Sequence, residues 1–377
     1  MALIFNEEQQ MLRDAAKTFI GENSPVSRLR ELRDRDEAWS PELWSGMADM
    51  GWTGITIAEQ FGGLDFGYVG AGIILEECGR TLAASPLLSS SMVCADLVAT
   101  LGSEQQKSDW LPRIASGEWI VSLALNEADR FDPGTIAATS VADGSGFALA
   151  GTKRHVPDAP MATHFLVVAR TNGQAATGDD LSLCLVDRNA AGLGVTLSLN
   201  LDARRVGELQ LDAVRIDADR VIGLGGGVGE GLQRALDIAA ALSAAELLGL
   251  AQEAFERTVG YLKERKQFGV PIGSFQALQH RAAQLFAELE LCKSVVLKAL
   301  QAIDADAPDR SLIASAAKAK VAKTARLAVN EAVQMHGGIG MTDEYDIGFF
   351  MKRARVGAEW LGDYGFHAAR VARARGF

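Results

Sequence analysis

The stretch ERKQFGVPIGSFQALQH, residues 264–280, separates two long runs that are rich in alanine and leucine. Apolar residues in both runs recur at helical spacing, which predicts a helix on each side of the stretch. Arg265 offers a fork of donors suited to a pyrophosphate, and Phe268 or Phe275 offers an aromatic face suited to adenine. A solvated arginine at a helix end is the commoner explanation, so the stretch by itself predicts a polar turn between two helices.

A second stretch, QMHGGIG, residues 334–340, follows another alanine-rich helical run. Gly337 and Gly338 lack Cβ atoms, so a flat or anionic group can come close to their backbone N–H groups. A glycine-rich end of a helix explains the same residues without any ligand. Both stretches are therefore candidate binding segments whose meaning depends on the rest of the chain.

The rest of the chain divides into a helical, a β and a second helical region. Asn6 is a good N-cap for a first helix, and apolar periodicity predicts two more over 41–50 and 70–82. Short apolar or alternating segments then predict strands over 147–150, 165–168, 181–186, 195–201 and 208–216. Helices follow over roughly 231–265, 275–304 and 309–336, with a shorter one at the C-terminus.

This order predicts an α+β multidomain fold. We expect an α-helical N-terminal domain over 1–118, a middle antiparallel β domain over 119–226 and a C-terminal four-helix bundle domain over 227–377. Six of the nine residues from Gly223 to Gly231 are glycine, but they form no strict G-x-G-x-x-G and no βαβ alternation surrounds them. We interpret this run as a hinge between sheet and helices rather than a nucleotide-binding loop.

Composition narrows the function classes. The 377 residues carry 37 Lys and Arg against 48 Asp and Glu, a formal charge of −11, which disfavours nucleic acid and anionic membrane surfaces as partners. The four cysteines stand far apart, which indicates a reducing compartment. The five histidines show no metal-binding spacing, so no metal is expected. The start lacks a basic leader, and the most apolar run, 236–251, is broken by Ser243 and Glu246, so we expect a cytoplasmic protein without a membrane span.

Taken together, the R-x-Q-F-G-x-P-I and Q-x-x-G-G-x-G segments resemble those of the acyl-CoA dehydrogenases. The N-terminal FNEEQQMLRDAAKTF, the pair Gly51-Trp52 and the run from Glu59 to Gly63 agree with that family. The resemblance covers essentially the whole chain and implies the flavin cofactor FAD and an acyl-CoA thioester substrate, with electron-transfer flavoprotein as acceptor. It also implies that segments of one subunit grip the adenosine diphosphate half of a neighbour's FAD. Transferred by position, the gripping residues are Arg265, Gln267, Phe268, Phe275, Gln276, Gln334, Gly337 and Gly338.

Two segments depart from the family pattern at the isoalloxazine end of the cofactor. Where the family has T-E-P-x-A-G-S-D, this chain reads NEADRFDP over 126–133, so Asp, Arg and Phe replace small residues. Where the family has W-I-S/T, this chain has His155-Val156-Pro157. Proline offers neither a hydroxyl nor a backbone N–H to the flavin. The chain's own flavin site is therefore expected to be impaired.

The family's catalytic carboxylate, which removes the α-proton while the flavin takes a β-hydride, is also missing. Its two expected positions hold Leu361 and Ala239. Glu246, seven residues after Ala239 on the same helix, is the candidate substitute base, although a packing role for this glutamate is the commoner case. Asp363 is expected to be a helix cap, and His336 a cap or a neighbour of FAD.

Three hypotheses follow. The first is a self-sufficient homo-oligomeric acyl-CoA dehydrogenase with a displaced base, Glu246. The second is a chain that resembles the degenerate subunit of hetero-oligomeric bacterial members, giving adenosine-binding segments to a related catalytic partner in α,β-dehydrogenation of an acyl-CoA, for fatty-acid or sterol side-chain β-oxidation. The third is another flavin oxidase or monooxygenase on the same fold. The retained motifs serve a neighbour's cofactor and the lost ones would serve the chain's own, so the second hypothesis is favoured, with a tetramer as the expected assembly.

Overall fold

A computed structural model describes residues 3–171, 180–224 and 226–377. The chain forms two compact units, each made of separated segments. Unit 1 contains Met1–Arg35, Tyr68–Ala83 and Ala240–Phe377, and unit 2 contains Asp36–Gly67 and Ala84–Ala239. The helical start, the β-sheet middle and the helical C-terminal region agree with the predicted fold class. The three predicted domain boundaries stay predictions.

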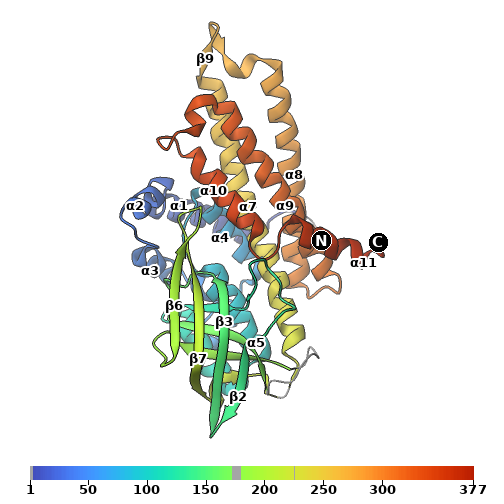
Figure 1. Ribbon diagram of the computed structural model, residues 1–377. Coiled ribbons are helices and arrows are strands. Elements are labelled where there is room, and N and C mark those ends of the chain that lie inside the picture. Colours follow the sequence, from blue (N-terminus) through green and yellow to red (C-terminus); the bar gives the residue numbers. More distant parts are fainter. Residues whose placement is uncertain (1–2, 172–179, 225) are drawn as a thin grey trace. The chain divides into compact units, whose positions relative to one another are not determined.

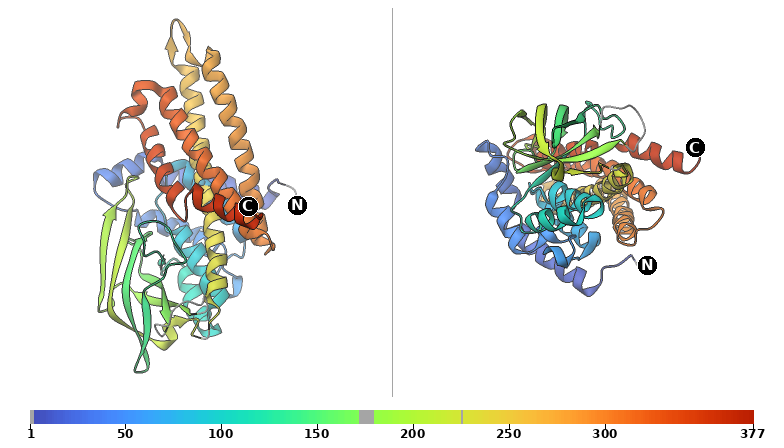
Figure 2. Two further views of the ribbon diagram at one scale, coloured as in Figure 1. Left: turned by 45° about the vertical axis from the view of Figure 1, so that its right-hand side comes forward. Right: turned by 90° about the horizontal axis from the view of Figure 1, so that it is seen from below.

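Unit 1 is helical. Its helices are α1 (Glu7–Asn23), α2 (Val26–Asp34), α4 (Gly67–Thr81), the larger part of α7 (Val228–Glu264), α8 (Gln276–Asp304), α9 (Arg310–His336), α10 (Ile347–Glu359) and α11 (Tyr364–Ala374). Figures 1 and 2 show α7, α8 and α9 lying side by side, with a hairpin joining α7 to α8 at the end marked β9. The shorter C-terminal helix expected from the sequence is two helices, α10 and α11, both packed on α9.

The first helix starts where its sequence predicts. The Asn6 side chain accepts a hydrogen bond from the backbone N–H of Gln9 at 2.8 Å, and the Gln9 side chain accepts one from the backbone N–H of Asn6 at 3.1 Å. This reciprocal capping box satisfies two donors that the first helical turn leaves without intrahelical partners. The N-cap role predicted for Asn6 is confirmed.

Unit 2 combines short helices with one sheet. The helices are α3 (Pro41–Asp49), α5 (Ala95–Leu101) and α6 (Glu104–Ala115), with 3-10 turns at Trp52–Gly54, Glu59–Phe61 and Ala218–Arg220 and a π-helix at Leu87–Cys94. The strands are β1 (Val121–Ala124), β2 (Thr139–Asp143), β3 (Gly146–Val156), β4 (His164–Thr171), β5 (Leu181–Asp187), β6 (Leu193–Leu199), β7 (Arg205–Asp217) and β8 (Val221–Ile222).

The strand order in the sheet is β6-β7-β3-β2-β4-β5-β8, and β1 pairs with β4. Neighbours are antiparallel except that β1 and β2 each run parallel to β4. In Figure 2 the long green and yellow strands β3, β6 and β7 stay side by side. Phe165, Val167, Leu209 and Val214 are among the residues of the core on one face, which the alternation of apolar and polar residues predicts.

Two details differ from the sequence-based expectation. Only helices are predicted after residue 231, whereas β9 (Lys266–Gln267) and β10 (Val270–Pro271) form a small antiparallel pair there. The predicted hinge includes Gly225, which lies outside the described residues, and Gly229 and Gly231 are part of α7, which begins at Val228. The hinge itself stays a prediction.

By length and composition, one described helix, α7, is apolar enough to cross a membrane. Its most apolar stretch of 18 residues is 94% buried inside the structure. An enclosed core helix of this length passes the same test, so the helix is weak evidence for a membrane span.

Candidate functional site

The first candidate segment is a projecting hairpin, which we call the hairpin arm (residues 265–276). Arg265 follows the last turn of α7, where its N–H donates to the carbonyl of Tyr261 at 2.8 Å, and its own carbonyl accepts from Ile272 N–H at 2.8 Å. Phe268 and Gly269 form the two-residue turn, both with positive φ, +51° and +84°. That backbone is typical of a tight hairpin turn, and glycine adopts it without strain.

The hairpin arm presents its predicted contact residues to solvent. Arg265, Gln267 and Gln276 are exposed, and the Phe268 side chain is 91% exposed. Phe275 is 38% exposed, and its ring stands edge-on to that of Phe268 with centroids 6.2 Å apart. Phe268, Val270 and Phe275 all expose apolar surface on this one hairpin, and grouped apolar exposure, unlike a single exposed side chain, indicates a surface that another molecule covers.

The second candidate segment, residues 334–340, begins in the last turn of α9 and continues into residues 337–340, which we call the diglycine turn. Gly337 has φ +65° and ψ −141°, a backbone conformation essentially restricted to glycine. Nothing lies within 4 Å of the place where a Cβ would stand at Gly337 or Gly338. Gln334 is exposed beside them. The turn therefore offers open backbone, as the sequence predicts. Both candidate segments lie within unit 1.

His336 lies buried just before this turn. Its Nδ1 is 2.7 Å from the carbonyl oxygen of Ala332, and its Nε2 is 3.1 Å from the hydroxyl of Tyr345. Burial lowers the pKa of His336, so the ring is neutral at pH 7. His336 is thus a buried support for the end of α9 rather than an exposed acid.

The segments that depart from the family pattern lie in unit 2, and hydrogen bonds within the unit hold them. Lys153 is fully buried, and its Nζ is 2.5 Å from Glu127 Oε1 and 3.2 Å from the Leu125 carbonyl oxygen. Burial lowers the pKa of Lys153 and Glu127 opposes that shift. The Glu127 carboxylate also accepts from the backbone N–H groups of Ala137 and Ala138. No pattern in the sequence indicates this buried pair, because the two residues lie 26 positions apart.

Contacts within unit 2 also hold the rest of the segments that depart from the family pattern. Arg154 pairs with Asp129 at 2.6 Å and approaches Glu208 at 3.7 Å. His155 has a φ of +53°, unusual for a residue with a side chain, and is exposed. The Pro157 carbonyl accepts a hydrogen bond from Ser122 Oγ at 2.5 Å. Pro157 itself has no N–H to offer.

The residues at and near the expected base positions have structural partners. Leu361 has a φ of +61°, and its carbonyl oxygen is 3.0 Å from Nε2 of His367. Ala239 is 1% exposed. Glu246 faces Arg353, with Oε1 3.7 Å from Nη1 and side-chain exposures of 14% and 2%. Asp363 caps α11 by accepting from the N–H of Phe366 at 2.7 Å, which confirms its expected role.

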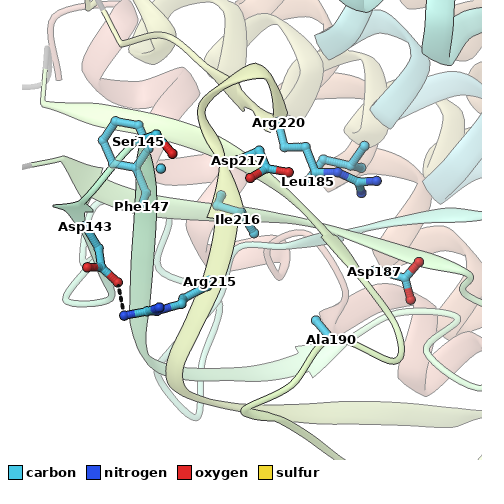
Figure 3. A pocket seen from close by; sticks show the side chains of 11 residues that line it. Asp143, Ser145, Phe147, Leu185, Asp187, Ala190, Arg215, Ile216, Asp217 and Arg220 are labelled. Carbon is cyan, nitrogen blue, oxygen red and sulfur yellow. Dashed lines mark ion pairs between the residues drawn. The ribbon is translucent and has the colours of Figure 1, made fainter.

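A separate cavity of about 290 Å³ opens at the end of the sheet in unit 2. Figure 3 shows the Asp143–Arg215 ion pair at its edge, with Phe147, Asp187 and Arg220 among the lining side chains. The Nη2 of Arg215 is 2.8 Å from Oδ2 of Asp143. None of the predicted site residues lines this cavity. Its charges are mixed, and it shows no set of groups aimed at one ligand.

Comparison with known proteins follows the three regions of the chain. Residues 6–118 match the model of the acyl-CoA dehydrogenase N-terminal domain, 125–214 that of the middle domain, and 229–375 that of the C-terminal domain. The acyl-CoA dehydrogenase FadE12 of Mycobacterium tuberculosis is 31% identical over 361 residues, covering 94% of this chain and 92% of the relative.

Two solved structures are similar over nearly the full length. The structure titled Tcur3481-Tcur3483 steroid ACAD has a TM-score of 0.88 and 31% identity, covering 98% of both chains. The ChsE4-ChsE5 complex from Mycobacterium tuberculosis has a TM-score of 0.89 and 26% identity, covering 100% of this chain and 99% of the other. With the three domains, the length and the order of elements in agreement, this chain belongs to the acyl-CoA dehydrogenase family.

Proposed function

We propose that this chain is a subunit of a hetero-oligomeric acyl-CoA dehydrogenase, in which it helps to hold the FAD that a related catalytic subunit uses. The reaction is the α,β-dehydrogenation of an acyl-CoA thioester. The observation that carries the proposal is the contrast between two sets of residues. Those that would hold the adenosine diphosphate half of a neighbour's FAD are present and exposed, whereas those that would face the isoalloxazine half of the chain's own FAD are replaced.

The residues of unit 1 fit the adenosine diphosphate half. Arg265 would pair with the diphosphate, and the open backbone of Gly337 and Gly338 would lie against it. Phe268 and Phe275 would cover the adenine, with Gln267, Gln276 and Gln334 as hydrogen-bonding neighbours. Because Phe268 is 91% exposed within its own chain, its natural contact is a molecule held outside this chain.

The residues of unit 2 fit the isoalloxazine half poorly. Pro157 removes a backbone donor. In the segment 126–133, Asp, Arg and Phe replace the family's small residues, and Asp129 of this segment pairs with Arg154. FAD, when bound, supplies the acceptor of the β-hydride. This chain's own residues bind and orient that cofactor through Arg265 and the diglycine turn, and no carboxylate stands at Leu361 or Ala239 to take the α-proton.

Further parts of the proposal rest on the family and on the relatives. Two of the similar structures, Tcur3481-Tcur3483 and ChsE4-ChsE5, each combine a pair of named proteins, which supports a partner of related fold. The first of these is named as a steroid enzyme, which supports β-oxidation of a fatty-acid or sterol side chain as the setting. We also propose a cytoplasmic tetramer with three domains per chain, and electron-transfer flavoprotein as the acceptor.

The competing function is a self-sufficient homo-oligomer that uses Glu246 as its base. Glu246 lies on α7 beside Arg353, which agrees better with a packing role. A flavin oxidase or monooxygenase has no observation in its favour. We therefore retain the hetero-oligomer as the proposed function.

The test compares the tagged chain purified alone with the complex that it brings down from its native host. We expect the chain alone to be nearly colourless and the complex to show the absorption band of bound flavin. In the complex, Arg265→Ala removes a charge-assisted contact and lowers FAD affinity by roughly tenfold or more. Full flavin occupancy of the chain alone, or undiminished FAD retention in Arg265→Ala, contradicts the proposal.

A further inference from the structure

Three aromatic side chains, Tyr261, His336 and Tyr345, form a cluster close to the two candidate binding segments. The ring centroids of Tyr261 and His336 are 4.5 Å apart, and those of His336 and Tyr345 are 4.8 Å apart. His336 is 3% exposed, and the two tyrosines are half-buried. We call this set the aromatic cluster. It joins α7, α9 and the loop 342–346 inside unit 1.

The hydrogen bonds of the aromatic cluster define the proton positions. A carbonyl oxygen only accepts, so Nδ1 of His336 carries the proton and donates to Ala332 at 2.7 Å. Nε2 is then an acceptor, and the Tyr345 hydroxyl at 3.1 Å is its donor. Tyr345 thus supplies the one partner that completes the hydrogen bonding of a buried imidazole, and a phenylalanine there would fill the space without completing it.

Tyr261 lies next to the hairpin arm in the chain, and His336 lies next to the diglycine turn. Tyr261 stands one helical turn before Arg265, whose N–H donates to the Tyr261 carbonyl at 2.8 Å. His336 directly precedes Gly337, and a Cβ added at Gly340 would stand 3.0 Å from the His336 Cβ. The ring contact between Tyr261 and His336 therefore links the residue one helical turn before Arg265 to the residue directly before the diglycine turn.

The third member, Tyr345, is held from the other side by a clamp from α2. Arg33 binds Asp343 through two bonds, Nη1 to Oδ1 at 2.7 Å and Nη2 to Oδ2 at 3.0 Å. Arg30 donates to the Asp343 carbonyl at 2.6 Å and to the Asp346 carboxylate at 2.9 Å. The residues on both sides of Tyr345 are thereby fixed, and paired arginine–carboxylate bonds fix direction as well as distance.

We propose that the aromatic cluster is the positioning element that sets the spacing between Arg265 and the diglycine turn, and that the Tyr345–His336 hydrogen bond locks it. Tyr261, His336 and Tyr345 are positioning residues, since they act through the segments they support. This inference rests on the proposed function, because it takes both segments to contact one FAD diphosphate. Binding groups on separate elements must be held within about 0.5 Å of the geometry that the ligand needs. A cluster that keeps their spacing constant therefore increases the affinity for that ligand.

The test uses Tyr345→Phe, which keeps the ring and removes the hydroxyl. The matched control is Tyr364→Phe on α11, where the ring is 51% exposed and lies outside the cluster. In the full chain without cofactor, we expect Tyr345→Phe to raise amide hydrogen exchange at Gly338 to Gly340 and at Arg265 by about three- to tenfold, the effect of one lost hydrogen bond. Exchange in the sheet of unit 2 should stay unchanged, as should all exchange in the control.

The second measurement is FAD retention in the complex purified through this chain. We expect Tyr345→Phe to weaken FAD binding by about three- to tenfold and Tyr364→Phe to leave it unchanged. In the double variant Arg265→Ala/Tyr345→Phe, the loss should be smaller than the product of the single losses, because the hydroxyl acts through the arginine.

Three results overturn the inference. If exchange at the two segments is the same in Tyr345→Phe, the cluster does not fix them. If Arg265→Ala weakens FAD binding and Tyr345→Phe does not, the proposed function stands and the positioning role is wrong. If Arg265→Ala itself has no effect, the proposed function fails and takes the positioning role with it.

Discussion

Gly249 on α7 lies directly against the backbone of Glu76 on α4, so that a Cβ added at Gly249 would stand 1.8 Å from the Glu76 carbonyl oxygen. The relationship is reciprocal, because a Cβ at Gly79 would stand 2.0 Å from the carbonyl oxygen of Glu246. Two helices thus meet backbone to backbone inside unit 1. Glu246 is fixed at this crossing, which is a reason to treat it as part of the packing of the helices.

The crossing predicts a large difference between two glycines of the same helix. Gly249→Ala forces α4 and α7 apart and should lower the free energy of unfolding by about 1–3 kcal/mol or more, the usual cost of overpacking. Gly260→Ala is the control, since nothing lies within 4 Å of its added Cβ. It should be neutral or stabilising by up to about 1 kcal/mol, because alanine is the better helix former. Urea unfolding of both variants measures the difference, and equal effects would refute the close crossing.

Buried histidines predict how stability depends on pH. His367 is 1% exposed, and burial, followed by the nearby Lys318 cation, lowers its pKa to about 4. An unfolded histidine has its pKa near 6.5, so between pH 6.5 and 4 the unfolded chain binds more protons than the folded one. Stability from this group is therefore complete above about pH 6.5 and decreases as the pH falls, by about 2 kcal/mol at pH 5.

The measurement is urea unfolding of the parent and of His367→Gln at pH 7.5 and pH 5. Glutamine retains a donor for the Leu361 carbonyl but does not titrate, so the loss of stability on acidification should be smaller in this variant. His280→Gln, at an exposed position, should lose as much stability between pH 7.5 and pH 5 as the parent does. A pH dependence that His367→Gln leaves unchanged would show that another group, such as buried His164 with its pKa near 4, dominates.

The Glu127–Lys153 pair predicts an asymmetric pair of mutations. Glu127→Gln leaves the fully buried Lys153 without its carboxylate, and breaking such a pair should lower the free energy of unfolding by about 3–5 kcal/mol. Adding Lys153→Met removes the buried cation and should restore a large part of that loss. Thermal or urea unfolding of the single and double variants measures this. A double variant no more stable than Glu127→Gln would contradict the assignment.

Local features of the fold were predictable from the sequence. Asn6 and Gln9 form a capping box because both residues sit at the spacing it requires, and alternating residues mark β7 because every second side chain faces the core. Phe268-Gly269 was placed correctly in a turn. The short hairpin around it was missed, because two-residue strands have no period to detect.

Contacts between residues that lie far apart in the chain could not be predicted from the sequence. Arg33 and Asp343 are 310 positions apart, and no pattern in either neighbourhood indicates the other. The start of α4 is similar: the Asp304 carboxylate from α8 accepts from the backbone N–H groups of Tyr68 and Val69. Tyr345 follows the diglycine turn in the sequence, but only the folded chain shows that its hydroxyl bonds to His336.

The last prediction concerns turnover and the missing base. Leu361 and Ala239 carry no proton acceptor, and Glu246 lies beside the Arg353 guanidinium. Loss of a positioned base costs roughly two to four decades in rate, so the chain alone should oxidise acyl-CoA thioesters at least that much more slowly than the complex with its partner.

Any residual turnover should be the same in Glu246→Gln, which should instead lower thermal stability, because a buried ion pair loses its negative charge. Asp363→Asn, at the N-cap of α11, is the control, and since asparagine also caps helices it should change neither quantity much. Turnover is measured with an artificial electron acceptor and added FAD. Rapid turnover by the chain alone that disappears in Glu246→Gln and persists in Asp363→Asn would make Glu246 the base and this chain a complete enzyme.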